Sequence, residues 1–502
     1  MDIDDAYTKV VGTFGRFQII IYSLMSIYGL FLAPFNLIAY FVDSSPKDIK
    51  EFQKVNPRVK NDSSIVVEWN LENEAWLSDF IQALYFTGFL FGVTMFGQAS
   101  DRYGRKKTML VGFHLLFPIC LGTSFSTSWQ MFAFFRTANG FLGGGVTLVL
   151  FVYLQEIVGR KWWAVTGSLL NGLFALGIVV MVGIAYAVPP WRTMIQILVI
   201  PQVVPLISLW FLPESPRWLY SQGKLAEAES VLIKIAKRNG VNHPVLSLVK
   251  KPSEHKKSSF TVIDLFKNRT TLKRLLIMGY IWFVCSFVYY GLTLAAGDIG
   301  SNPYMNELLS GVVELPTMMF TAYILDRKWC GRKRGLVVAL LTAGVCCFIL
   351  MFYKEKNTLK MGVGLSGKML IATAFNIIYI YSPELFPTVV RNAALGSQSM
   401  CARVGGILSA QMKTLVAINP LVAYLLFAIT GITSGLLSFF LPETLGIKPP
   451  DSFADLDSQI KKNCPARITP NVPRMVMSNL RKKENNLEHA ELLLASDEDD
   501  IF

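Results

Sequence analysis

The chain has 502 residues, 52% of them hydrophobic and 17% charged, with a formal net charge of +13 and a mean hydropathy of +0.42. Soluble domains carry about 25% charged residues, so this composition excludes an ordinary soluble globule and predicts an all-α membrane protein. The positive charge does not indicate a nucleic-acid partner, because it is concentrated in short gaps between apolar runs, where it faces the surface of a lipid bilayer.

Twelve apolar runs are long enough to cross the bilayer, which takes about 20 residues in a helix. They cover approximately 16–42, 76–100, 107–126, 129–150, 161–187, 190–212, 272–296, 305–325, 334–353, 362–383, 392–412 and 418–441. We therefore predict twelve transmembrane helices in two six-helix halves. The division of 161–212 around Pro189 and Pro190 is left open.

The two sets of six runs predict a domain plan for the whole chain. It consists of a cytoplasmic N-terminus at 1–15, an N-terminal half at 16–212 with an outer loop at 43–75, a cytoplasmic inter-half loop at 213–271, a C-terminal half at 272–441 and a cytoplasmic tail at 442–502. The tail has few apolar residues, so we expect it to be mostly disordered.

The distribution of Lys and Arg predicts the orientation in the membrane. The gaps 101–107, 213–271 and 326–334 are rich in basic residues, and such gaps face the cytoplasm. An even number of spans then places both termini in the cytoplasm. The first apolar run is too long for a cleaved signal peptide, so we expect a multi-pass protein, most simply of the plasma membrane.

Two short motifs predict modification and sorting. Asn61 begins an Asn-Asp-Ser sequon in the outer loop, on the side where N-glycosylation is possible. Glu488, Leu492 and Leu493 in the tail match an acidic dileucine pattern, which predicts a sorting adaptor as partner. The alternative is that this part of the tail is only solvated chain.

An unusual charged turn occurs twice, in corresponding gaps of the two halves. Its residues are Gly97, Asp101, Arg102, Gly104 and Arg105 in the first copy and Asp326, Arg327, Gly331 and Arg332 in the second. The glycine at 104 permits a tight turn, and the aspartate at 101 can face a helix N-terminus and nearby arginines. We predict a gate that latches the cytoplasmic ends of the helices; the alternative is that the charges only anchor the topology.

These turns, together with Arg136-x-x-x-Gly140 and the sequence PESPRWL at 213–219, resemble the major facilitator superfamily. The sequences ELFPTVVRN at 384–392 and LPET at 441–444 resemble solute carrier family 22, the organic ion transporters. Stretches at 220–223 and 282–293 look most like the zwitterion- and carnitine-type branch around member 15. The resemblance covers about residues 10–445. One departure is the outer loop, which is short and cysteine-free where most members have a long, cysteine-rich one.

The resemblance implies a carrier that works by alternating access, and for Arg136 a structural or gating role and contact with the substrate both stay open. Ionisable residues inside spans cost about 2.5–3.5 kcal/mol each on insertion scales, so each needs a partner or a function. Arg403 is the arginine found in anion- and carnitine-type members, where cation carriers have an acidic residue, and a guanidinium can hold a carboxylate by two parallel hydrogen bonds. Lys368 matches a lysine of the same branches. Glu314 pairs with either a substrate cation or Lys368, and both readings stay open.

Four aromatic residues complete the predicted substrate site: Trp282, Tyr289, Phe375 and Tyr379. A quaternary ammonium over such rings gains about 0.5–2 kcal/mol. The residues at 368, 375 and 379 recur at helical spacing, which is compatible with one face of a helix. Ordinary packing against helices or lipid is the alternative explanation at each position.

We therefore expect a transporter of small organic zwitterions such as carnitine or ergothioneine. The alternatives are a carrier of organic anions or cations of the same family and, in a different class, a non-transporting receptor or vesicle protein. The sequence contains no nucleophile–base set, phosphate loop or metal-ligand spacing, so we expect neither an enzyme nor a cofactor. A coupling ion, sodium or proton, is left open.

Overall fold

The computed structural model describes residues 1–60, 63–242, 244–249, 268–295, 302–325, 327, 329–353, 358–387, 390–447, 450 and 456. All regular secondary structure in these ranges is helical. The first part of the chain forms α1 (Ile3–Ala6), η1 (Tyr7–Val11), α2 (Arg16–Leu37), α3 (Ala39–Val42), α4 (Pro46–Val55), α5 (Ile65–Glu68), α6 (Ala75–Tyr103), α7 (Arg105–Thr123), α8 (Trp129–Ile157), η3 (Arg160–Trp162), α9 (Trp163–Ala187), α10 (Trp191–Val199), η4 (Ile200–Gln202), α11 (Val203–Phe211), α12 (Pro216–Ser221) and α13 (Leu225–Arg238).

The second part contains α15 (Arg269–Leu294), α16 (Pro303–Leu325), α17 (Gly331–Leu350), α18 (Thr358–Leu385), α19 (Arg391–Ala410), α20 (Met412–Ile418) and α21 (Pro420–Ser438). The short gap between the last two expected runs, at 413–417, is not loop, because these residues lie in helix α20. The predicted outer loop is likewise not simply loop, since α3 ends just before it and α4 and α5 lie within it.

Ten helical segments of the described chain are long and apolar enough to cross a membrane. The remaining two of the twelve expected runs correspond to α7 and α19, helices of 19 and 20 residues that are not among those ten. Three consecutive basic residues begin α7, which makes it more polar than its neighbours. The all-helical membrane class is confirmed, whereas the count of twelve spans stays a prediction.

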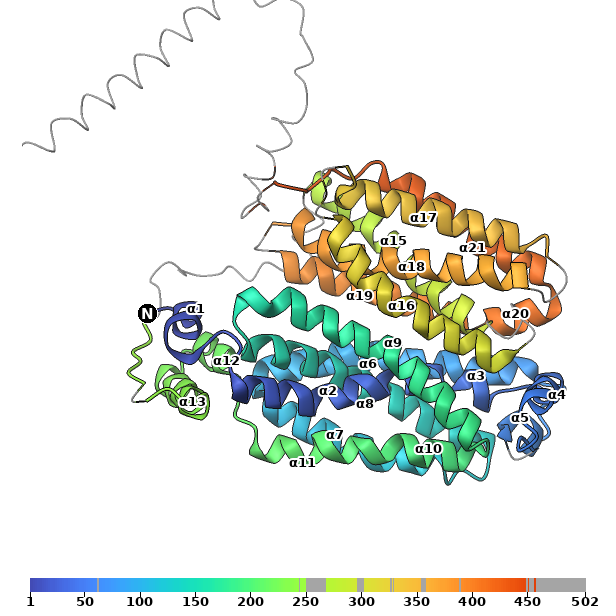
Figure 1. Ribbon diagram of the computed structural model, residues 1–502, viewed down its shortest axis with the longest axis horizontal. Coiled ribbons are helices and arrows are strands. Elements are labelled where there is room, and N and C mark those ends of the chain that lie inside the picture. The colour runs from blue at the N-terminus through green and yellow to red at the C-terminus, as the bar shows by residue number, and fades with distance from the viewer. Residues whose placement is uncertain are drawn as a thin grey trace, which may run out of the picture. The chain divides into compact units, whose positions relative to one another are not determined.

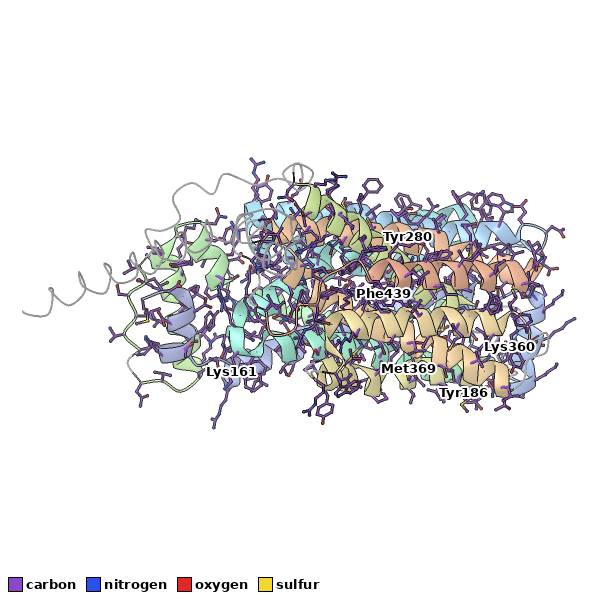
Figure 2. The ribbon with its side chains drawn as sticks, turned by 90° about the horizontal axis from the view of Figure 1, so that it is seen from above. Lys161, Tyr186, Tyr280, Lys360, Met369 and Phe439 are labelled. Atoms are coloured by element: carbon purple, nitrogen blue, oxygen red, sulfur yellow. The ribbon has the colours of Figure 1, made fainter. Side chains whose placement is uncertain are left out.

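The helices pack in two groups (Figure 1). In the first, α6 and α7 pack against α8, and α2 packs against α9; in the second, α15 packs against α19, and α17 packs against α18 and α21. Two pairs, α16 with α9 and α19 with α6, join the groups. Figure 2 shows Lys161 and Tyr186, which flank most of α9, at opposite ends of the bundle. The domain boundaries themselves stay a prediction.

Glycines bring the most closely packed helices together. A Cβ atom at Gly92 of α6 would lie 1.8 Å from the carbonyl oxygen of Phe141 on α8, and one at Gly405 of α19 would lie 2.3 Å from that of Phe283 on α15. Only glycine allows such backbone approach. The same kind of contact therefore assembles one tight helix pair in each group.

The first residues of the chain are folded against the cytoplasmic helices. Tyr7 in η1 belongs to a buried cluster with Trp218 of α12 and Leu232 of α13, and these elements lie together in Figure 1. Asp4 pairs with Arg217 at 2.7 Å. The predicted N-terminal segment and part of the predicted inter-half loop thus form one packed layer.

Candidate functional site

An ion pair between α16 and α18 lies at the centre of the predicted site. The Lys368 ammonium lies 3.1 Å from the Glu314 carboxylate, and both side chains are buried. The Tyr289 hydroxyl lies 2.9 Å from each oxygen of that carboxylate and donates to it. The sequence left open whether Glu314 pairs with a substrate cation or with Lys368. In this conformation it pairs with Lys368. Neither charge is therefore free to meet a substrate here.

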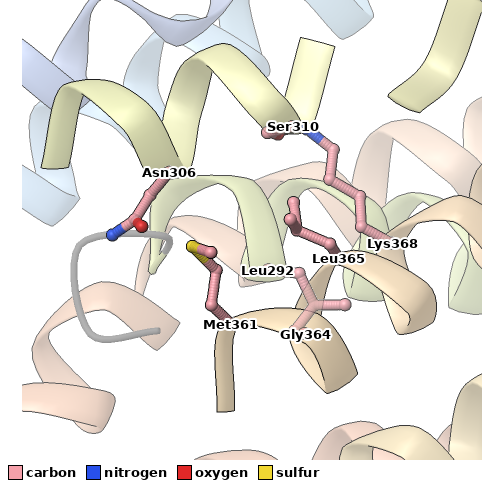
Figure 3. Close-up of a pocket in the computed structure, with 7 residues that line it drawn as sticks. All are labelled: Leu292, Asn306, Ser310, Met361, Gly364, Leu365 and Lys368. Carbon is pink, nitrogen blue, oxygen red and sulfur yellow. Dashed lines mark hydrogen bonds between the residues drawn. The ribbon is translucent and has the colours of Figure 1, made fainter. Parts of the chain in front are cut away.

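A small pocket lies beside this ion pair (Figure 3). It is lined by Leu292, Asn306, Ser310, Met361, Gly364, Leu365 and Lys368. Figure 3 shows the lysine reaching across to Ser310 of α16, with which it also makes a hydrogen bond. The cavity volume is about 10 Å³, which is room for about one water molecule. An organic ion does not fit in this pocket as it stands.

Arg403 on α19 faces the first group of helices. Its guanidinium carbon lies 4.3 Å from the centre of the Phe89 ring on α6, and the hydroxyl of Tyr290 is a close neighbour. The Nε atom is buried and has no hydrogen-bond partner. Within the described ranges no carboxylate pairs with this arginine. It thus supplies a positive charge at the boundary between the two helix groups that no described carboxylate neutralises.

The four predicted aromatic residues lie together in space. The Trp282 ring is 4.7 Å from that of Tyr379 and 6.0 Å from that of Phe375, and Tyr289 is 6.1 Å from Phe375. Trp282 and Tyr289 are buried, Phe375 is half-buried and Tyr379 is 45% exposed. The rings of Phe375 and Tyr379 are thus partly exposed, and the buried rings of Trp282 and Tyr289 pack against them.

Sequence reasoning missed Glu307, a second acidic residue on α16. It is 0% exposed, and neither of its carboxylate oxygens has a hydrogen-bond partner in the described part of the chain. It precedes Glu314 by seven residues, which places both on one face of the helix. That spacing could have identified Glu307 as a second residue of the site. Glu307 lies at the edge of the predicted span, however, where a charged residue does not by itself indicate a functional role.

Several contacts join the two helix groups at the end that carries α3, α4 and α20, which is the outer end in the predicted topology. The ring of Tyr304, at the start of α16, packs between Phe41, Phe52 and Tyr186, with centroid distances of 5.7, 5.0 and 5.4 Å. The Tyr40 hydroxyl donates to the Pro303 carbonyl at 3.0 Å. We name this set, Tyr40, Phe41, Phe52, Tyr186 and Tyr304, the outer aromatic latch.

A polar contact reinforces the outer aromatic latch. The backbone N–H of Thr414 donates to the Asp79 carboxylate of α6 at 3.0 Å, and the Lys413 ammonium donates to the Asp43 carbonyl at 2.8 Å. The Asp43 carboxyl is itself buried, and burial raises its pKa to about 6 although Lys413 and Arg136 act in the opposite direction. The outer end is therefore closed in this structure.

The first charged turn forms a compact cluster at the other, cytoplasmic end. Gly104 has φ +105°, a conformation that favours glycine. The Glu214 carboxylate accepts from the backbone N–H groups of Arg105 and Lys106, both at 3.0 Å, and so caps α7. The Arg105 guanidinium pairs with Glu156 of α8 at 2.9 Å and with Asp101.

The second charged turn repeats this arrangement. Gly331 has φ +69°, and Glu443 accepts from the backbone N–H groups of Arg332 and Lys333 at 2.9 and 3.1 Å. The Arg332 guanidinium lies 3.4 Å from the Glu384 carboxylate. Each turn thus binds one carboxylate as a helix cap and a second as an ion pair.

Of the remaining predicted gating residues, those that the structure describes make other contacts. Arg102 stacks only on Tyr103, and Arg327 stacks on Tyr323, while Gly97 lies where α6 approaches α8. Asp326 lies outside the described residues, as do Asn61, Glu488, Leu492 and Leu493 of the predicted modification and sorting motifs.

Arg136 lies away from both charged turns. Its guanidinium donates to the Phe35 carbonyl at 2.9 Å and to Gln82 at 2.7 Å, and it stacks on the Tyr85 ring at 4.2 Å. These partners belong to α2 and α6. The arginine therefore joins three helices of the first group near the outer end.

Sequence reasoning also missed the four carboxylates that complete the two turns, Glu156, Glu214, Glu384 and Glu443, as gating residues. A signal was present, because Tyr-x-x-Glu occurs at 153–156 and 381–384, and Leu-Pro-Glu at 212–214 and 441–443. In the structure the two tyrosine hydroxyls donate to the carbonyls of Pro213 and Pro442. The duplication thus extends well beyond the charged turn.

Each charged cluster joins helices of one group only. Several hydrogen bonds connect the two groups at the end that carries α3, α4 and α20. The bundle is closed at the end that carries α3, α4 and α20, and the predicted latch of the two charged turns at the opposite end stays a prediction.

Comparisons with known proteins agree with this architecture. The profile of the family described as "Sugar (and other) transporter" matches residues 13–449. The chain is 39% identical to "Solute carrier family 22 member 15-like" of Xenopus tropicalis, over 91% of this chain and 97% of that protein. It is 34% identical to "Organic cation transporter protein" of Drosophila melanogaster, over 82% of this chain and 77% of that protein. The inward-open structure of the xylose transporter XylE from E. coli matches 88% of this chain and 99% of that chain with a TM-score of 0.64 and 15% identity, which shows a shared fold.

Proposed function

Because the chain belongs to the sugar (and other) transporter family and, within it, to solute carrier family 22, we propose that it carries a small organic zwitterion with a carboxylate and an ammonium group, such as carnitine or ergothioneine. The protein is a multi-pass membrane transporter of the major facilitator fold and not an enzyme. What we propose is the chemical class of the substrate, on the basis of which charged side chains have a partner of opposite charge.

Arg403 is the single observation that carries this proposal. Lys368 is neutralised by Glu314, so it does not offer a free charge to a carboxylate. The guanidinium of Arg403 has no carboxylate partner in the described chain, and its buried Nε has no acceptor. An uncompensated buried charge is costly, and a substrate carboxylate would remove that cost with two parallel hydrogen bonds.

The ammonium end of the substrate would bind to the aromatic residues. Glu314 already accepts from Tyr289 and pairs with the lysine, so it is not available as a counter-ion. The exposed ring of Tyr379 and the half-buried ring of Phe375 stack 5.9 Å apart. A cation over these rings would gain about 0.5–2 kcal/mol. A zwitterion thus has a partner for each of its charges.

The transport cycle would alternate between the arrangement seen here and one that is open at the outer end. The outer aromatic latch would separate as the halves 16–212 and 272–441 rock about the site, and the two charged turns would latch the cytoplasmic ends. This cycle places both termini in the cytoplasm of a plasma-membrane protein. It also places Asn61 outside for glycosylation and the dileucine motif, Glu488 with Leu492 and Leu493, inside for an adaptor.

An organic anion is the second candidate cargo, because Arg403 alone would bind a carboxylate without any ammonium. An organic cation is the third, since one relative is named for it. The three cargoes make different demands on the arginine. A zwitterion needs both the arginine and the aromatic rings, an anion needs the arginine, and a permanent cation needs only the rings.

Tracer uptake into proteoliposomes tests the assignment. Carnitine and ergothioneine serve as zwitterions, p-aminohippurate as an anion and tetraethylammonium as a permanent cation. We expect R403A to weaken the apparent affinity for carboxylates tenfold or more, since a hydrogen bond to a charged group contributes about 1.5–3 kcal/mol. R403K keeps the positive charge but loses the two parallel N–H donors of the guanidinium, so it should recover only part of the lost affinity.

R192Q is the matched control, because Arg192 pairs with Glu68 at the outer surface and its loss removes one positive charge away from the site. It should transport as the unmodified protein does. Undiminished carboxylate uptake by R403A would overturn the role of the arginine. Absence of flux for every compound would favour the non-transporting receptor or vesicle protein instead.

A further inference from the structure

Glu307 is buried without a partner at the outer end of the substrate region. Its side chain is 0% exposed, and no described group donates a hydrogen bond to either of its oxygens. It lies one helical turn after Pro303, which accepts from Tyr40 of the outer aromatic latch. The carboxyl group is therefore covered by the same contacts that close the outer end.

The charges around Glu307 do not balance. The groups whose charge reaches it are Glu314, which repels it, and Lys368, which attracts it. That lysine is already bound by Glu314 at 3.1 Å and by Ser310. One ammonium is thus shared between two carboxylates.

The other helices that pack on α16 supply no second cation to Glu307. The side facing α3 and α15 presents the hydroxyl groups of Tyr40 and Tyr289, and α9 carries Tyr186 near this end. No charge of α4, neither its lysines nor its carboxylates, is among the charges that reach Glu307. On α18 the further lysine, Lys360, lies by the ring of Tyr424, and the charges of α17 lie at the cytoplasmic end.

We propose that Glu307 is a proton-binding site that is occupied while the outer end is closed and empties toward the outside when that end opens. The step is the addition of one proton to a carboxylate oxygen, and it forms the neutral acid. Burying an ionised carboxylate without hydrogen bonds is far more costly than burying the acid. Sodium is the other ion that a buried carboxylate could bind.

The site links closure of the outer end to the binding of a proton. Separation of the outer aromatic latch would admit water to Glu307, and the hydrated carboxylate would ionise. Acid outside therefore favours closure by at most a factor of ten for each pH unit, which is the limit for one proton. This inference rests on the alternating-access cycle of the proposed function but not on the identity of the cargo.

Infrared difference spectroscopy of the purified full-length transporter in lipid provides the test without any substrate. The unmodified protein is titrated between about pH 5 and pH 8, where an ordinary Glu is ionised, and compared with E307Q. We expect a protonated carboxylic acid band that E307Q lacks and E307D retains at a shifted position. If E307Q instead lacks only an ionised carboxylate band, the proposal is overturned.

A sodium titration separates the proton from the other candidate ion. The acid band should be the same with and without sodium; a band that appears only when sodium is withdrawn overturns the proton and assigns the site to that metal. Uptake of carnitine at varied outer pH adds the functional readout, in which E307Q should lose the acid stimulation and E307D should keep it. If the acid band is present but the protein takes up no carnitine, the proposed substrate is refuted and the proton site is still supported.

Discussion

Removal of the Tyr304 side chain should open the outer end of the transporter. The ring is 7% exposed and packs against Phe41, Phe52 and Tyr186 of the other helix group at 5.0–5.7 Å. Each aromatic pair contributes about 0.5–1.5 kcal/mol beyond the area it buries, so the three pairs together contribute about 1.5–4.5 kcal/mol. Because these contacts exist only when the outer end is closed, Y304A should shift the conformational equilibrium about tenfold to a thousandfold toward the outward-open state.

Spin labels on the two sides of the outer end measure this shift. Cysteines at Glu51 on α4 and Asn419 after α20, in a background without other reactive cysteines, report the distance between the helix groups. Y304F keeps the three ring contacts and should resemble the unmodified protein. F352A is the matched control, because Phe352 is an exposed ring just after α17 that contacts Phe348 near the end of that helix. An unchanged distance distribution in Y304A would refute the latch.

Two further predictions concern buried charges. K368M leaves Glu314 as an uncompensated buried charge, so it should lower the free energy of unfolding by about 3–5 kcal/mol, while the double variant K368M/E314Q should recover most of the lost thermal stability; equal losses in the two would contradict the ion pair. The pKa of Asp43 is about 6 in the outer-closed state and about 3.9 when exposed, so the closed state binds the proton more tightly. Acidification should therefore favour closure, by about twofold at pH 6 and by about a hundredfold only below pH 4, and D43N should remove this component of the pH dependence in the spin-label distances.

The class, the family and the approximate positions of most helices could be predicted from the sequence. A bilayer imposes a strong length and polarity requirement on every span, so apolar runs identify spans with little help from tertiary structure. The requirement also explains why α7 and α19, whose basic and other polar residues lower their hydropathy, are not among the ten apolar segments. It also explains the missed helix α20, since helical structure next to a span leaves no hydropathy signal.

The sequence predicted which residues could form the candidate site but not which residues they contact. The aromatic residues at 282, 289, 375 and 379 do lie together, as helical spacing indicated for those on α18. Whether Lys368 would pair with Glu314 or remain free for a substrate could not be decided, because α16 and α18 approach each other only in the folded protein. The carboxylates that cap the two charged turns were missed for the same reason: Glu214 is more than a hundred residues from the backbone it binds.

The sequence by itself determined that this protein spans a membrane in two similar halves, because hydrophobic length and a duplicated charged turn are local properties of the chain. Only the tertiary structure decided which charges are satisfied. It neutralises Lys368 with Glu314, leaves Arg403 without a carboxylate in the described chain and buries Glu307 beneath the outer aromatic latch. The physical reason is that the cost of a buried charge depends on its neighbours in space, and the packing of the helices chooses those neighbours.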